Sequence, residues 1–72
     1  MDQLELEYAR KRKGKSREDM ASAIGKSVVS YVKKERGEVT FSDDEKIIIS
    51  RELDLTPEQF NVIFFDGNLP LR

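Results

Sequence analysis

The chain has 72 residues, enough for one small domain, and a domain of this length buries only about 60% of the surface that its unfolded chain exposes. Hydrophobic residues and charged residues each make up 38% of the sequence, and neither cysteine nor histidine occurs. Their absence excludes disulfide bonds, thiolate and imidazole metal sites, and nucleophilic catalysis by Cys or His. We therefore expect no enzyme and no cofactor.

No apolar run approaches the roughly 18 residues that a membrane-spanning helix needs. The N-terminus, Met1-Asp2-Gln3-Leu4-Glu5, lacks the order of basic then apolar residues that is typical of a signal peptide. We therefore expect a cytoplasmic protein that has no contact with a membrane.

The formal net charge of −1 hides a polarised distribution. Residues 1–8 carry three acids for a charge of −3, and residues 9–36 carry ten Lys and Arg against three acids for +7. Residues 37–72 carry eight acids against three bases for −5. Because local charge marks an electrostatic footprint better than total charge does, residues 9–36 are the candidate segment for binding a polyanion.

Glycines and capping residues delimit the first two predicted helices. The first helix runs from about Leu4 to Lys13 and stops at Gly14. Its apolar residues predict one buried stripe, formed by Leu4, Leu6, Tyr8 and Ala9. The second helix follows Ser16, carries acidic residues in its first turn, where the helix dipole favours them, and closes at Gly25.

The third predicted helix follows Ser27, another capping residue, and ends at Gly37. Its β-branched residues also suit a strand. The helical signals on both sides and the length of the segment favour a helix.

Two capping-box patterns mark the start of the last two helices. Ser42 and Glu45 stand in the order S-x-x-E ahead of a helix that should run to about Leu53. Thr56 repeats the pattern, with proline at the first helical position and glutamine at the third. The last helix carries a strongly apolar set, Phe60, Val62, Ile63, Phe64 and Phe65.

The segment from Arg17 to Gly37 satisfies the steric rules of a helix-turn-helix. Its fifth position packs where the two helices meet and must be small, and it is alanine, Ala21. Its ninth position turns sharply, often with a positive φ, and it is Gly25. The fourth and eighth positions face the core, and both are apolar, Met20 and Ile24.

The sequence S-R-E-D-M-A-S-A-I-G-K-S, followed at a fixed distance by K-K-E-R-G, resembles the lambda-repressor/Cro-like (XRE-type) helix-turn-helix family of phage and bacterial regulators. The segments S-Y-V-K-K-E-R-G-E-V-T-F-S and F-N-V-I-F-F-D-G-N-L-P are similar to small Cro/repressor-type proteins of Gram-positive phages and prophages. The resemblance covers about residues 4–65. It implies an all-α, five-helix lambda-repressor-like DNA-binding domain over residues 1–65, followed by a short C-terminal tail, residues 66–72.

The resemblance implies that the third helix enters the major groove of DNA. The side chains placed to read bases are then Ser27, Val28, Val29 and Lys33. Lys33 can donate to guanine O6 and N7, Ser27 can donate to a base or a phosphate, and the valines can contact thymine methyl groups.

The resemblance also implies phosphate contacts around this helix. Arg17 occupies a place that usually holds a phosphate-contacting Gln, and a guanidinium should hold a phosphate at least as well. The flanking candidates are Lys26, Lys34 and Arg36, and a second group around the first turn is Lys11, Lys13 and Lys15.

The residues leave the rotation of the third helix open. In one arrangement Tyr31 fills the core position that is usually aliphatic, and Lys34 buries only its methylene stem. In the other, Val28 and Val32 face inward, which removes Val28 from base readout. It is equally open whether Val28 and Val29 are plain core residues.

Two charged groups have a structural and a functional interpretation. The resemblance favours a structural ion pair for Arg10 and Glu35, between the first helix and the end of the third. Asp43, Asp44 and Glu45 could form a Mg²⁺ or acid–base site, but their place in the first turn of a helix favours capping and compensation of the dipole.

Apolar residues near the C-terminus exceed what so small a core needs and suggest a partner surface. Because symmetric operators require a dimer, we hypothesise a homodimer formed through Ile48, Phe64, Phe65, Leu69 and Leu71. In the alternative, the tail folds back over its own core.

Together these features predict a sequence-specific transcriptional regulator that binds a pseudo-palindromic double-stranded DNA operator, in the manner of a Cro-like repressor. One rival is a protein-interaction module that uses the same basic face for a protein or polyanion. Another is an antitoxin-like regulator, which would bind both DNA and a toxin.

Overall fold

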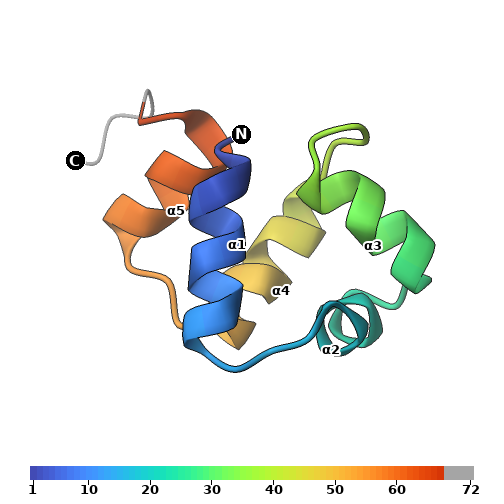
Figure 1. The fold of residues 1–72 in the computed structure, drawn as a ribbon. Coiled ribbons are helices and arrows are strands. Elements are labelled where there is room, and N and C mark those ends of the chain that lie inside the picture. The colour runs from blue at the N-terminus through green and yellow to red at the C-terminus, as the bar shows by residue number, and fades with distance from the viewer. Residues whose placement is uncertain (68–72) are drawn as a thin grey trace.

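Polar side chains cap the start of every helix in the computed structural model, which describes residues 1–67. Within these residues the helices are α1 (Gln3–Arg12), α2 (Arg17–Ala23), α3 (Val28–Glu35), α4 (Asp43–Glu52) and α5 (Pro57–Phe65) (Figure 1). The caps are Asp2, Ser16, Ser27, Ser42 and Thr56. At α2, α4 and α5 the third helical residue completes a capping box. The prediction of an all-α, five-helix fold is confirmed.

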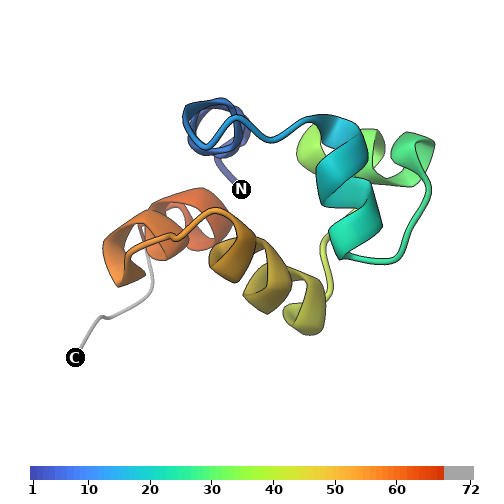
Figure 2. The same cartoon turned by 90° about the horizontal axis from the view of Figure 1, so that it is seen from below.

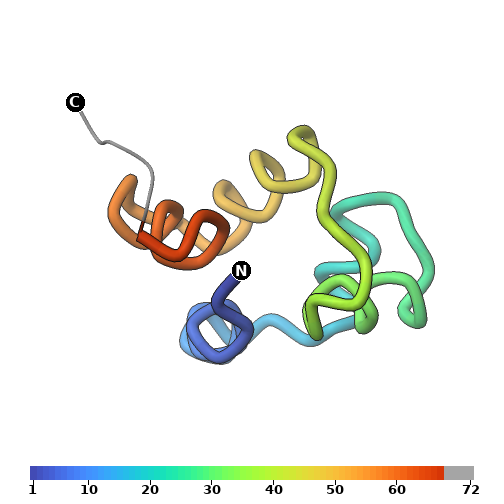
Figure 3. The backbone as a smooth tube through the Cα atoms, turned by 90° about the horizontal axis from the view of Figure 1, so that it is seen from above, coloured from blue at the N-terminus to red at the C-terminus, as the bar shows by residue number. Residues whose placement is uncertain are grey.

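The helices lie in two groups around one core. Figure 1 shows α1 and α5 on one side and α2 with α3 on the other, with α4 between them. Seen from below and from above, α1 and α3 lie along one side of the domain, α4 and α5 lie along the other, and α2 closes one end (Figures 2 and 3). The backbone N–H of Asp2 donates to the carbonyl of Ile63 at 2.7 Å, so the start of α1 is held against α5.

A chain of aromatic rings runs through the core. Tyr31 contacts Phe41 with ring centroids 6.0 Å apart, and Phe41 meets Phe64 edge to face at 5.8 Å. Phe64 in turn lies 5.0 Å from Phe60. These contacts link the inner face of α3 to α5, so the position of α3 depends on a core that spans the domain.

The buried stripe of α1 differs from the predicted one. Leu6 and Ala9 are buried, but Leu4 and Tyr8 are 64% and 57% exposed, so their predicted burial is wrong. Arg10 is buried instead, because its guanidinium has a carboxylate partner inside the protein. The spacing of apolar residues in α1 could not predict this burial, because it depends on an ion pair with Glu35 of α3.

The predicted dimer surface is only partly available. Phe64 is buried in the core of its own chain, so its assignment to a dimer contact is wrong. Ile48 and Phe65 are half-buried and pack against the core, and the ammonium of Lys46 lies 4.8 Å from the centre of the Phe65 ring. The remaining candidates, Leu69 and Leu71, lie outside the described residues.

Candidate nucleic-acid interface

The turn between α2 and α3 has the backbone that its sequence predicts. Gly25 adopts φ +68°, and a Cβ there would meet open space, so the backbone conformation rather than crowding favours glycine. The N–H of Lys26 donates to the carbonyl of Ala21 at 2.9 Å and closes the turn. Met20, Ala21 and Ile24 are buried, which confirms the predicted core positions of the helix-turn-helix.

The rotation of α3 follows from which of its residues are buried. Tyr31 is fully buried, whereas Val28 and Val29 are 38% and 67% exposed. The first arrangement is therefore confirmed for Tyr31, and neither Val28 nor Val29 is a core residue. Val29 and Lys33 are exposed four residues apart and share one face of the helix, with Val28 beside them. This exposed face, Val28, Val29 and Lys33, is the reading face of α3.

Ser27 stands at the amino-terminal edge of the reading face and caps α3. Its Oγ accepts a hydrogen bond from the N–H of Ser30 at 3.1 Å. The hydroxyl proton is not used in that bond, so Ser27 can still donate to a base or a phosphate. Capping and DNA contact are therefore compatible at this residue.

A buried carboxylate joins three helices beside the reading face. Glu35 of α3 accepts from Arg10 Nε at 3.0 Å and from a second Arg10 nitrogen at 3.3 Å. The Nε of Arg17, the first residue of α2, lies 3.5 Å from the same carboxylate. The predicted Arg10–Glu35 pair is confirmed, and Arg17 was not predicted to join it. Two guanidinium groups share one carboxylate, so the cluster of Arg10, Arg17 and Glu35 carries a net positive charge.

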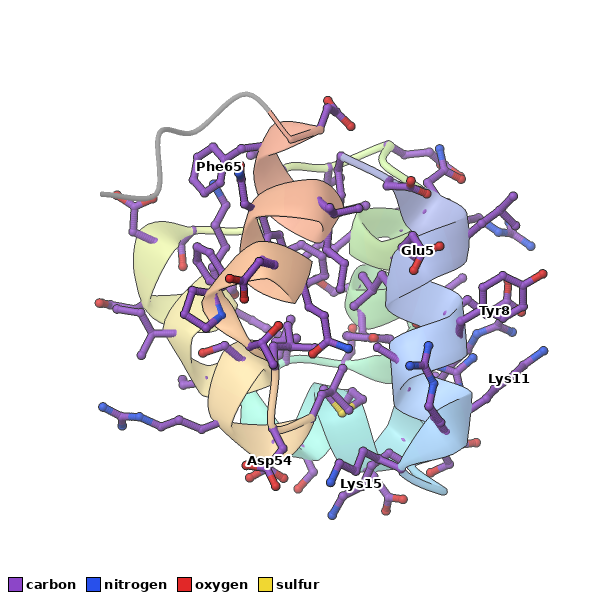
Figure 4. All side chains as sticks on the ribbon, turned by 90° about the vertical axis from the view of Figure 1, so that its left-hand side faces the viewer. Glu5, Tyr8, Lys11, Lys15, Asp54 and Phe65 are labelled. Carbon is purple, nitrogen blue, oxygen red and sulfur yellow. The ribbon has the colours of Figure 1, made fainter. Side chains whose placement is uncertain are left out.

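Arg17 also lines a shallow groove between α1 and α3. Its other walls include Lys11 and Glu7 of α1 and the side chains of Val28 and Val32. Lys11 Nζ lies 2.9 Å from Glu7, and the hydrogen bond and charge of that ammonium lower the pKa of Glu7. Lys11 projects from the same side of α1 as Tyr8 (Figure 4). Cations from α1 and α2 thus stand beside the reading face of α3, together with two acidic residues, Glu7 and Glu18.

Comparison with known proteins identifies this arrangement. The family model for helix-turn-helix domains matches residues 6–60, which include α2, the turn and α3. The chain belongs to this family, whose type is XRE-like, or lambda-repressor/Cro-like. A search of curated proteins and a search of solved structures each found no match. The family consists of DNA-binding regulatory domains, so the partner of this helix-turn-helix domain is double-stranded DNA.

Two of the predicted phosphate contacts form ion pairs with acidic residues at the end of α4 and just after it. Lys13 Nζ lies 3.3 Å from Asp54, and Lys15 Nζ lies 4.0 Å from Glu52 at the carboxyl-terminal end of α4. Lys15 and Asp54 lie together at the end of α1 away from its N-terminus, apart from Lys11 and Tyr8 (Figure 4). Lys11 lies within α1, whereas Lys13 caps the carboxyl-terminal end of that helix and Lys15 follows in the loop, so this run of basic residues divides between two surfaces.

Lys34 is also excluded from the phosphate set. Its side chain is buried, and its Nζ donates to Glu45 Oε1 at 2.6 Å. The prediction that it contacts a phosphate is wrong, because its ammonium is already paired inside the domain. Lys26 and Arg36 are exposed at the two ends of α3 and remain candidates with Arg17.

Glu45 has the capping role that its position predicts. Its side chain accepts from the N–H of Ser42, and its own N–H donates to Ser42 Oγ. Within residues 1–67 no group of three or more His, Cys, Asp or Glu side chains could hold a metal ion. No helix in that range is long and apolar enough to cross a bilayer.

The stability of the domain should depend on acid through Glu45. Burial alone raises the pKa of its carboxyl, but the hydrogen bonds from Lys34 and Ser42 and the charges of Lys34 and Lys26 outweigh burial and lower the pKa below its ordinary value of 4.5. A carboxyl whose pKa is lower when folded stabilises the protein fully above its unfolded pKa, and this contribution disappears as pH falls through the folded pKa. We expect the Tm to fall between about pH 5 and pH 3 for this reason.

Thermal melts followed by circular dichroism over this pH range test the prediction. Glu45→Gln should have a lower Tm at neutral pH, because Lys34 loses its partner, and a flatter dependence on acid. The exposed Glu58→Gln is the matched control and should keep the wild-type slope. A Glu45→Gln profile as steep as the wild type would assign the acid sensitivity to other carboxyls.

Proposed function

We propose that this helix-turn-helix domain is a sequence-specific transcriptional regulator of the Cro-like phage or prophage type, which represses by occupying a promoter. The observation that carries the proposal is the reading face of α3. Val28 and Val29 are apolar yet exposed, and Lys33 is exposed beside them. Apolar side chains and a donor on one exposed helical face suit a major groove that presents thymine methyl groups and guanine acceptors.

The cations around that face support a phosphate-positioning role. Arg17 is held at the start of α2 by Glu35, and its side chain remains 42% exposed. Lys26 lies in the turn before α3, Arg36 caps the end of α3, and Lys11 lines the groove beside Arg17. Contacts of this kind fix the orientation of a protein on the duplex while the base contacts select the sequence.

We further propose that the operator is pseudo-palindromic and that two copies bind it. In such a complex the two α3 helices lie about 34 Å apart on one face of the duplex. The apolar side chains that α4 and α5 offer to a second copy include Ile47 and Val62, 45% and 40% exposed, and the half-buried Ile48 and Phe65. Sedimentation at high concentration, with and without operator, tests the dimer, and a monomer under both conditions rejects it.

Selection of bound duplexes from a random pool tests the function directly. We expect one enriched half-site, repeated with inverted symmetry. Binding of the selected duplex should weaken steeply between about 50 and 200 mM salt, because each neutralised phosphate contributes about −0.9 to the slope of log affinity against log salt. Enrichment of no sequence would reject the specific regulator, and affinity that is independent of salt would reject the phosphate contacts.

A further inference from the structure

A buried ion pair joins the last turn of α3 to the first turn of α4. Lys34 Nζ lies 2.6 Å from Glu45 Oε1, and the two side chains are only 10% and 7% exposed. The pair lies on the inward side of α3, because Lys34 projects about 100° away from the exposed Lys33 and is buried. It therefore links the inner side of the DNA-reading helix to the rest of the core.

The carboxylate end of this pair is fixed by backbone. The same Glu45 Oε1 accepts from the N–H of Ser42 at 2.9 Å, and the N–H of Glu45 donates to Ser42 Oγ at 3.1 Å. The capping box thus holds this oxygen at the start of α4. Lys34 consequently has one acceptor at one position, and any rotation of α3 about its axis would lengthen or bend a short bond.

Stability alone does not account for a charged pair in this place. Removing two charges from water costs about as much as their attraction returns, and apolar side chains of similar volume are often as stable or more stable. The surroundings suit apolar groups, since Lys34 Nζ lies 6.0 Å from the centre of the Phe41 ring, which packs on Tyr31 and Phe64. A methionine in place of Lys34 would fill much of this space.

Few contacts on the inward side of α3 fix the rotation of this helix about its axis. Tyr31 is the fully buried apolar side chain of this eight-residue helix, and its contacts with the core are aromatic and weakly directional. The directional contacts come from the two carboxylates. Glu35 holds α3 to α1 and α2, and Glu45 holds it to α4 through Lys34. Two such anchors fix the direction in which Val29 and Lys33 point.

We infer that Lys34 and Glu45 are a positioning pair that sets the rotation of α3, and so the discrimination between DNA sequences, rather than the stability of the domain. The inference rests on the proposed function. Base readout tolerates errors of only about 0.5 Å or 10–20° in the groups that make it, whereas phosphate contacts through long side chains tolerate more. Loss of the pair should therefore weaken specific binding more than nonspecific binding.

The double variant Lys34→Met/Glu45→Gln tests whether the pair affects sequence discrimination rather than stability. Glutamine keeps an acceptor for the N–H of Ser42, methionine replaces the lysine stem, and no unpaired charge is left in the core. The probes are the duplex that the wild type selects from a random pool and a scrambled duplex of the same composition. We expect an unchanged or higher Tm, and a fall of about tenfold in the ratio of the two affinities, the size of one weakened base contact.

The matched control is Lys13→Met/Asp54→Asn, which removes one lysine and one acid, 3.3 Å apart, from an exposed ion pair. Its affinity ratio should equal that of the wild type. Lys34→Arg is a second test, since it retains the charge but changes the length and geometry of the contact, and its ratio should also fall. A ratio unchanged in both Lys34 variants overturns the inference, even if the Tm falls. If the wild type itself does not distinguish the two duplexes, the proposed function fails instead.

Discussion

Replacing Glu35 with alanine should lower the free energy of unfolding by about 3–5 kcal/mol, because removal of one partner leaves a buried charge without compensation. Arg10 is 6% exposed, and two of its nitrogens donate to Glu35, while a third donates to the carbonyl of Lys15 at 2.9 Å. Small domains are marginally stable, with unfolding free energies near the lower end of about 5–15 kcal/mol. A loss of this size should leave much of the Glu35→Ala protein unfolded at 25 °C.

Urea unfolding followed by circular dichroism measures this effect. The double variant Arg10→Met/Glu35→Gln removes both charges and should recover most of the lost stability, because no guanidinium is left buried and unpaired. Arg17→Ala breaks a contact with the same carboxylate, but the arginine is 42% exposed and water screens the pair, so its cost should not exceed about 1 kcal/mol. An equal cost for Arg17→Ala and Glu35→Ala would place the main attraction at the surface instead of in the core.

The parts of the fold that were predicted from sequence are those set by neighbouring residues. Ser16, Ser42 and Thr56 cap helices because the groups that they bond lie three residues away in sequence. Gly25 predicts a sharp turn because a positive φ is a property of its own backbone. Local rules of this kind need no knowledge of the rest of the domain, and they located α2, α3 and the turn between them.

The errors all concern side chains whose surroundings come from distant parts of the chain. Lys34 was assigned to a phosphate because it flanks the reading helix, with at most its methylene stem buried, and its partner Glu45 already had a sufficient explanation as a cap. Leu4 was predicted to be buried and is exposed, whereas Phe64 was predicted to lie at a dimer surface and is buried. An apolar side chain shows only that it can be buried, not that it is. The packing of α1, α4 and α5 decides which apolar residues are buried and which are exposed.

The residues of the reading face were assigned from sequence, but the contacts beside that face were not. The resemblance to lambda-repressor/Cro-like proteins assigned Val28, Val29 and Lys33 to base contacts, and the burial of Tyr31 leaves all three exposed. The link from Arg17 to Glu35 had no signal in the sequence, because it depends on how α2 meets α3. The ion pair between Glu7 and Lys11 was not predicted, although the spacing of four residues between them is the signal that could have found it.

Lys33→Ala and Arg17→Ala should weaken DNA binding in two different ways. Lys33 is on the reading face, so its loss should cost about 1–3 kcal/mol on the preferred duplex, or about 5- to 150-fold in affinity. The cost on a scrambled duplex should be much smaller, and the selected sequence should lose its preference at one position of each half-site. The test compares the affinities of each variant for both duplexes, together with a new selection from the random pool.

Arg17→Ala should instead weaken the preferred and scrambled duplexes by the same factor and reduce the salt slope by about 0.9 for each protomer. The reason is that a phosphate contact carries no sequence information, whereas a contact to a base edge does. Arg51→Ala, which removes an exposed arginine from the last turn of α4, is the control for a simple change in net charge. If Lys33→Ala and Arg17→Ala weaken every sequence alike, Lys33 contacts phosphate, and the direct reading of bases rests on Ser27, Val28 and Val29.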